Sequence, residues 1–120
     1  MFQINNKIVT LIRGDSFKSP IIINAGTFLE PIHYTLTKDD TLYFALMEPN
    51  QSFENAVLKK VYTVDSEKDE NGDIYLIFSS SDTENLLPGI YYYTIKLVTT
   101  VDNKTEVNTI VPNTQFNIIN

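Results

Sequence analysis

The chain contains no cysteine and no tryptophan, and it has only four glycines and one histidine in 120 residues. Without cysteine, it has no disulfide framework, no thiolate metal site and no thiol nucleophile. The single histidine, His33, has no Ser or Asp motif attached to it, so the sequence does not indicate a hydrolase triad. The fold must therefore rest on packing and strand pairing.

Basic residues are also scarce. Nine Lys and Arg stand against fifteen Asp and Glu, which gives a formal charge of −6. Because neutralising phosphates needs clustered cations, this balance argues against nucleic-acid or anionic-membrane partners. There is no apolar run of about 18 residues and no basic region followed by an apolar one at the start of the chain. We therefore expect neither membrane insertion nor export by a signal peptide.

What is present is an alternation of β-branched and aromatic runs with turn residues. The length and the 42% apolar content suit one domain over residues 1–120. Strand patterns spaced about 10 to 20 residues apart are typical of a sandwich or barrel. We predict an all-β fold, an immunoglobulin-like antiparallel β-sandwich of about seven strands. The expected strands are residues 7–12, 17–24, 41–47, 56–64, 74–79, 90–99 and 106–111, the last resuming at 115–119 after Pro112, with one short strand near 33–36.

Two local signals refine this outline. Asn71-Gly72 predicts a hairpin with a type I′ turn, because both residues tolerate positive φ. Residues 82–87 predict a single helical turn capped by Ser81 or Asp82, with Glu84 three residues after Ser81 as in a capping box.

Two motifs have both a functional and a structural interpretation. Asp69, Asn71 and Asp73 have the oxygen spacing of a calcium loop, but Gly72 is misplaced and the position of the bidentate Glu is a serine. Residues 13–15 form the integrin tripeptide Arg-Gly-Asp, which recurs by chance and supplies a turn between strands. We favour the turn in both cases and predict no catalytic, metal-binding or cofactor-binding residue.

The run Tyr91-Tyr92-Tyr93 lies in a strand whose side chains alternate between faces. Tyr91 and Tyr93 are expected to fill the core, with one phenol bonding the backbone near the turn as in a tyrosine corner. Tyr92 and Lys96 then share the opposite face. Because outward aromatic side chains anchor interfaces or stack on sugars, Tyr92 and Lys96 form our candidate interaction surface.

Four segments together resemble a known family. They are residues 13–17 (RGDSF), 42–45 (LYFA), 71–73 (NGD) and 82–93 (DTENLLPGIYYY). The pattern resembles the amino-terminal domain of the baseplate upper protein of phages infecting Gram-positive bacteria, and related domains of tail and head-fibre proteins. That resemblance implies a β-sandwich that docks a longer fibre or receptor-binding part onto the particle.

The resemblance spans roughly residues 10 to 97 and supplies no catalytic residues. Its anchor positions are expected to be structural. Gly14 and Gly89 would set the backbone conformation, whereas Phe17, Phe44 and Tyr91 would pack in the core.

The leading hypothesis is a non-enzymatic virion protein of a bacteriophage tail, baseplate, neck or head fibre. It would need no cofactor, would contact other virion proteins and copies of itself, and would be made in the host cytoplasm and located in the virion. Because fibre proteins usually continue into a coiled or receptor-binding region and this chain stops after its last strand, we expect a decoration or adaptor subunit. The alternative is a carbohydrate-binding or adhesin-like module that presents tyrosines to a host-surface glycan.

Overall fold

The computed structural model describes residues 8–26 and 29–120. Strands dominate this part of the chain, with one 3-10 turn and one short α-helix among them. The elements are β1 (Val9–Ile12), β2 (Phe17–Pro20), β3 (Ile23–Gly26), β4 (Pro31–Tyr34), β5 (Asp40–Met47), η1 (Phe53–Asn55), β6 (Leu58–Tyr62), β7 (Tyr75–Phe78), α1 (Ser80–Thr83), β8 (Gly89–Val101) and β9 (Lys104–Ile119).

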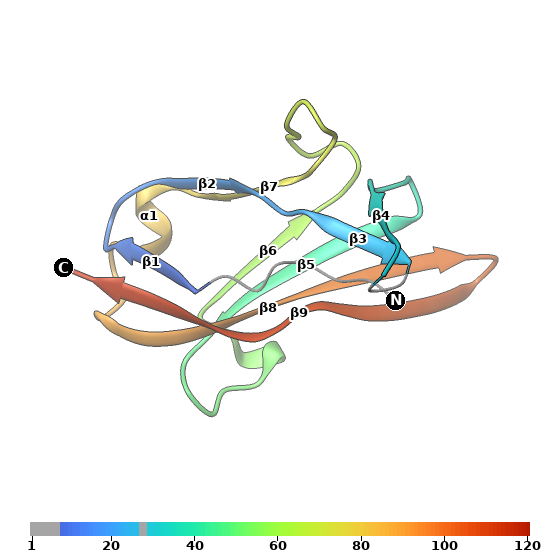
Figure 1. Ribbon diagram of the computed structural model, residues 1–120. Helices are drawn as coiled ribbons and strands as arrows, with labels where there is room; N and C mark the ends of the chain where they lie inside the picture. The colour runs from blue at the N-terminus through green and yellow to red at the C-terminus, as the bar shows by residue number, and fades with distance from the viewer. Residues whose placement is uncertain (1–7, 27–28) are drawn as a thin grey trace.

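The strands form two layers. One layer is a five-stranded sheet in the order β1-β9-β8-β5-β6, and the pairs β2-β7 and β3-β4 lie over one of its faces (Figure 1). The predicted all-β sandwich is therefore confirmed. It is antiparallel except at β1, which pairs with β9 in parallel. The predicted strand at 17–24 is divided into β2 and β3, and the short strand expected near residues 33–36 is β4, which begins earlier, at Pro31.

Strand β9 continues through Pro112, where the sequence suggested an interruption. Because proline has no backbone N–H to donate, it fits a strand only at an edge or an irregularity. The register between β8 and β9 shifts twice, between Tyr93 and Ile95 and again between Ile95 and Lys96. These shifts place extra residues in β9 around Pro112. The strand therefore accommodates the proline at an irregularity and continues beyond it.

The helical turn begins earlier than predicted. It spans Ser80–Thr83 instead of 82–87. The Ser79 N–H donates to Asp82 Oδ2 over 2.8 Å, which is the contact we had assigned to Ser81 and Glu84. The same Ser-x-x-acid spacing occurs twice between Ser79 and Glu84. The first of these two copies comes directly after β7, and it begins the helix.

The hairpin at Asn71-Gly72 is present, but its predicted turn type is wrong. Of Asn71 and Gly72, only Gly72 has positive φ, at +84°. The Gly72 N–H donates to Asp69 O over 3.1 Å. This geometry is a turn of the type I family followed by a left-handed glycine. Positive φ at two successive residues, as a type I′ turn requires, is found at Asp102 (51°) and Asn103 (63°), between β8 and β9.

The core between the layers is built around Phe78 of β7. Its ring lies 5.5 Å from Phe44, 5.4 Å from Phe116 and 5.9 Å from Phe17, measured between ring centroids. Tyr93 completes the group by stacking on Phe44. Phe17 and Phe78 belong to one layer and Phe44, Phe116 and Tyr93 to the other. The aromatic cluster therefore joins the two layers.

We predict that Phe78→Ala lowers the free energy of unfolding by about 3–5 kcal/mol, because it removes a buried ring from the centre of the cluster. Urea unfolding followed by fluorescence or circular dichroism measures this change. Phe78→Leu retains most of the volume and should cost less. Val61→Ala, on an exposed side chain, is the control, and an equal loss in both alanine variants would contradict the assignment.

Candidate interaction face

Two of the four segments that carry the resemblance, residues 13–17 and 82–93, meet at one end of the sandwich. The Gly14 N–H, in the turn between β1 and β2, donates to Thr83 Oγ1 over 2.9 Å. Thr83 is fully buried, so this hydrogen bond satisfies a polar group that has no access to water. Gly14 has φ of +83°, a conformation that costs little only for glycine. The Arg-Gly-Asp segment is thus a turn that is hydrogen-bonded to α1.

The tyrosine corner supplies a second hydrogen bond at this end of the sandwich. Tyr91 is buried, and its hydroxyl donates to Leu87 O over 2.7 Å. Burial, together with the nearby Glu48 carboxylate, raises the pKa of Tyr91, so the phenol stays a donor. Tyr93 is buried as well. The expected inward placement of both tyrosines, and the corner, are confirmed.

The five structural anchors occupy the positions expected of them. Phe17, Phe44 and Tyr91 all belong to the core or pack against it. Gly14 and Gly89 both have positive φ, at +83° and +157°. None of the five presents a reactive group to solvent.

The adjacent acidic residues Asp39 and Asp40 are typical of a solvated loop, but Asp40 is a buried carboxylate at the start of β5. It accepts hydrogen bonds from the Tyr34 hydroxyl, from Thr37 N at 2.9 Å and from Thr99 Oγ1 at 2.6 Å. Burial alone would raise the pKa of Asp40, but the hydrogen bonds from Thr99, Tyr34 and Thr37 outweigh it and hold the pKa below its ordinary value. Burial and the bond to Asp40 raise the pKa of Tyr34 to about 12. The group ties the start of β5 to β8.

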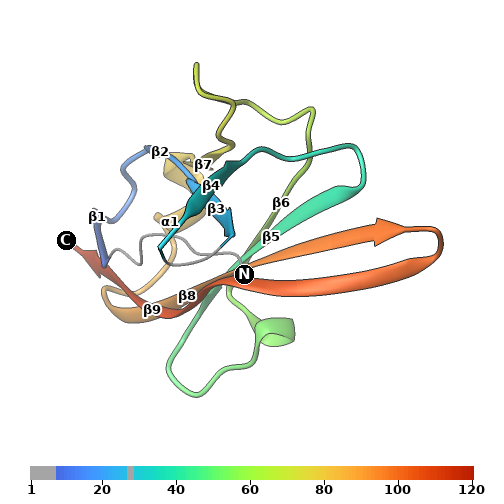
Figure 2. The ribbon, with the colours of Figure 1, turned by 45° about the vertical axis from the view of Figure 1, so that its right-hand side comes forward.

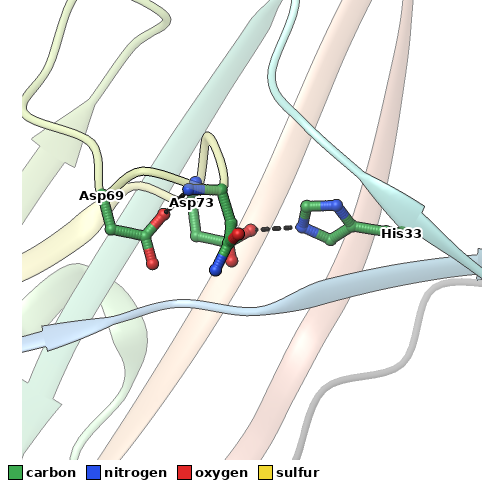
Figure 3. Close-up of polar contacts among 4 residues, drawn as sticks. His33, Asp69 and Asp73 are labelled. Atoms are coloured by element: carbon green, nitrogen blue, oxygen red, sulfur yellow. Dashed lines mark hydrogen bonds and ion pairs between the residues drawn. The ribbon is translucent and has the colours of Figure 1, made fainter.

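His33 takes part in a structural contact. Its Nε2 lies 2.6 Å from Asp73 Oδ1, and Figure 3 shows the imidazole pointing from β4 to the turn that carries Asp73. Asp69 Oδ1 accepts from the backbone N–H groups of Asn71 and Asp73, each over 2.9 Å. The carboxylate of Asp69 therefore closes the turn, as the structural interpretation of this loop predicted.

Among the residues described, no group of three or more His, Cys, Asp or Glu side chains is arranged to hold a metal ion. No helix within residues 8–26 and 29–120 is long and apolar enough to cross a membrane. An apolar groove of about 310 Å³ opens between the layers beside β1, lined by side chains such as Phe17, Leu76 and Ile95. Its lining residues carry no charge that would orient a polar substrate.

The outer face of the five-stranded sheet is the surface on which exposed apolar side chains gather. Leu11, Tyr91, Phe116 and Ile118 point into the core, so their neighbours along β1, β8 and β9 lie on the other side. The register places these neighbours in adjacent rows. We call this set the neutral half-face: Thr10, Ile12, Ile90, Tyr92, Gln115, Asn117 and Ile119.

The neutral half-face contains no ionisable group except the Tyr92 phenol. Ile12, Ile90 and Ile119 are 48%, 54% and 44% exposed. Exposed apolar side chains grouped on one rigid surface mark a contact site more reliably than scattered ones. Sequence reasoning identified Tyr92 but missed the isoleucines, because only the register brings β1 and β9 beside β8.

The two residues of the predicted interaction surface have different surroundings. Tyr92 and Lys96 share the outer face of β8, as expected from the alternation. The Lys96 Nζ lies 4.4 Å from the centroid of the Phe53 ring of η1, a cation–π contact that holds it against the protein. On the same side, Lys59 Nζ donates to Glu54 O over 2.6 Å. The η1 segment therefore packs against Lys96 and Lys59, whereas Tyr92 lies with the neutral half-face.

No protein-family model, no curated protein and no solved structure matches this chain.

We predict that Thr83→Val destabilises the protein by about 1–3 kcal/mol, because it leaves the Gly14 N–H without its acceptor while keeping the side-chain shape. Thr83→Ser keeps the hydroxyl and should cost only about 1 kcal/mol, from one lost methyl group. Urea unfolding of both variants tests this. A serine variant as unstable as the valine variant would show that packing, and not the hydrogen bond, holds the turn.

We also predict that Asp40 contributes to acid sensitivity. Its folded pKa is lowered, so its stabilisation is present above its ordinary pKa of about 4 and is lost as the pH falls through the lower folded value. Asp40→Asn should lower stability at pH 7 and flatten the decline below about pH 4. Urea unfolding between pH 7 and pH 2 measures both effects. Asp39→Asn, at an exposed neighbour, should reproduce neither.

Proposed function

We propose that this protein is a non-enzymatic structural component of a bacteriophage particle that acts through protein–protein contacts. The observation that carries the proposal is the neutral half-face, where exposed isoleucines and Tyr92 share one side of a sheet that the core holds rigid. Contact surfaces of this kind are depleted of charge and enriched in aromatic and aliphatic side chains. A partner protein would recognise such a surface through its shape and its apolar area, and not through charge.

The virion assignment draws on the resemblance and on how its segments meet. The RGDSF and DTENLLPGIYYY segments lie far apart in sequence, yet Gly14 and Thr83 are joined by a 2.9 Å hydrogen bond. Phe17 and Tyr91, from the same two segments, both pack with the one core. These two segments of the pattern are thus physically joined, which supports treating their co-occurrence as more than a coincidence.

A second contact element is the hairpin where β8 turns into β9. Pairing between β5 and β8 ends at Asp40 and Thr99. Residues 100–105 continue beyond this point as a hairpin arm that projects past the other strands (Figure 2). Val101, on the arm, is 49% exposed, and Val107, at its base opposite Val98, is 57% exposed. A projecting arm with exposed valines on it and at its base suits insertion against a neighbouring subunit. This again favours a component of an assembly.

The competing proposal is a glycan-binding module. Tyr92 is flanked across the strand pair by Gln115, and an aromatic ring beside an amide could bind a sugar. It requires the isolated chain to bind glycans and to lose binding in Tyr92→Ala. Absence of binding to a broad glycan panel would count heavily against it.

We expect the chain to be recovered from purified phage particles of a source that encodes it, at a fixed stoichiometric copy number, by quantitative mass spectrometry. Immunogold labelling would then place it in the head, neck or tail. Washing particles with high salt separates an integral component from a contaminant. Absence of its peptides from intact, infectious particles would refute the virion assignment and favour the glycan-binding module.

A further inference from the structure

We infer that the neutral half-face binds a second copy of this chain around a two-fold axis. The inference builds on the proposed function, because it names the partner for the surface that carries it. Three independent features of the described residues support a copy of the same chain as the occupant. They are the distribution of charge, the chemistry of the polar side chains and the character of the sheet edges.

The charge distribution favours self-contact at this surface over others. The chain has a net charge of −6, so two copies repel wherever acidic groups meet. Residues 65–73 alone contain five Asp and Glu. On the neutral half-face, the only ionisable group is the phenol of Tyr92. Two copies that meet there place no like charges opposite each other, and a basic partner would find no carboxylate to pair with.

The polar side chains of the half-face are complementary to themselves. Gln115 Nε2 donates to Asn117 Oδ1 over 2.8 Å, and Asn117 Nδ2 approaches Thr10 Oγ1 at 3.4 Å. These contacts leave each amide with further donor and acceptor capacity. A two-fold axis places the same residues opposite one another. Each amide can then donate to its counterpart and accept from it, which neither a lysine nor a carboxylate could do.

The edge strands of the sheets differ in how well they are protected against pairing with another chain. β6, at the far edge of the five-stranded sheet, carries Lys59 and Lys60, and β2 ends at Pro20. Charges and prolines at edges prevent association between strands. β1, which borders the neutral half-face, has the sequence Val-Thr-Leu-Ile and neither device. The unprotected edge and the neutral half-face are therefore continuous.

The test is the oligomeric state of the full chain, measured by sedimentation equilibrium up to about 1 mM, the weak end of specific affinities. We expect association of the wild-type protein into dimers. The double variant Ile90→Lys/Ile119→Lys should weaken it at least about tenfold, because it buries two cations per copy. Val61→Lys is the matched control, since Val61 is 57% exposed and lies on the same face in β6. It should leave the dimer intact.

Urea unfolding of each variant shows that the fold is retained. Amide hydrogen exchange should show added protection in β1 and the adjoining end of β9 as concentration rises. A wild-type chain that remains monomeric to 1 mM would overturn the inference, and so would a Val61→Lys variant as dissociated as the double variant. Recovery from particles together with a monomer in solution overturns this inference alone. A dimer absent from particles overturns the virion assignment alone.

Discussion

The rest of the structure depends on the aromatic cluster around Phe78. Without a disulfide, the two layers depend mainly on side chains packed between them, and Phe78 contacts rings from both layers. The cluster also determines which way each strand faces. Because Phe44, Tyr93 and Phe116 turn inward, their neighbours in β5, β8 and β9 must turn outward. The interaction surface is therefore a consequence of the core.

Much of this fold follows from the sequence, because strand alternation is a local property. The inward Tyr91 and Tyr93 and the outward Tyr92 were predicted by alternation alone. The features that escaped prediction depend on partners distant in sequence. Asp40 gave no sign that Thr99 would donate to it, and Ile12 gave no sign that it would lie beside Ile119. The start of α1 was missed for a different reason, since two equivalent capping patterns overlap between Ser79 and Glu84.

The candidate site was predictable in part for the same reason. Tyr92 and Lys96 were assigned correctly to one face, but sequence could not show that η1 folds back to cover Lys96. Local alternation gives the direction of a side chain and not its neighbours. A surface assembled from β1, β8 and β9 therefore needs the strand order before it can be identified.

The parallel pairing of β1 with β9 has a mechanical consequence. A force that pulls the beginning of β1 and the end of β9 in opposite directions runs along both strands, so it shears their ladder of hydrogen bonds. All the bonds of the Val9–Ile12 ladder then bear the load together, whereas an antiparallel pair pulled apart at its open end would yield one bond at a time. A pull of this kind therefore meets its resistance from the whole β1–β9 ladder at once.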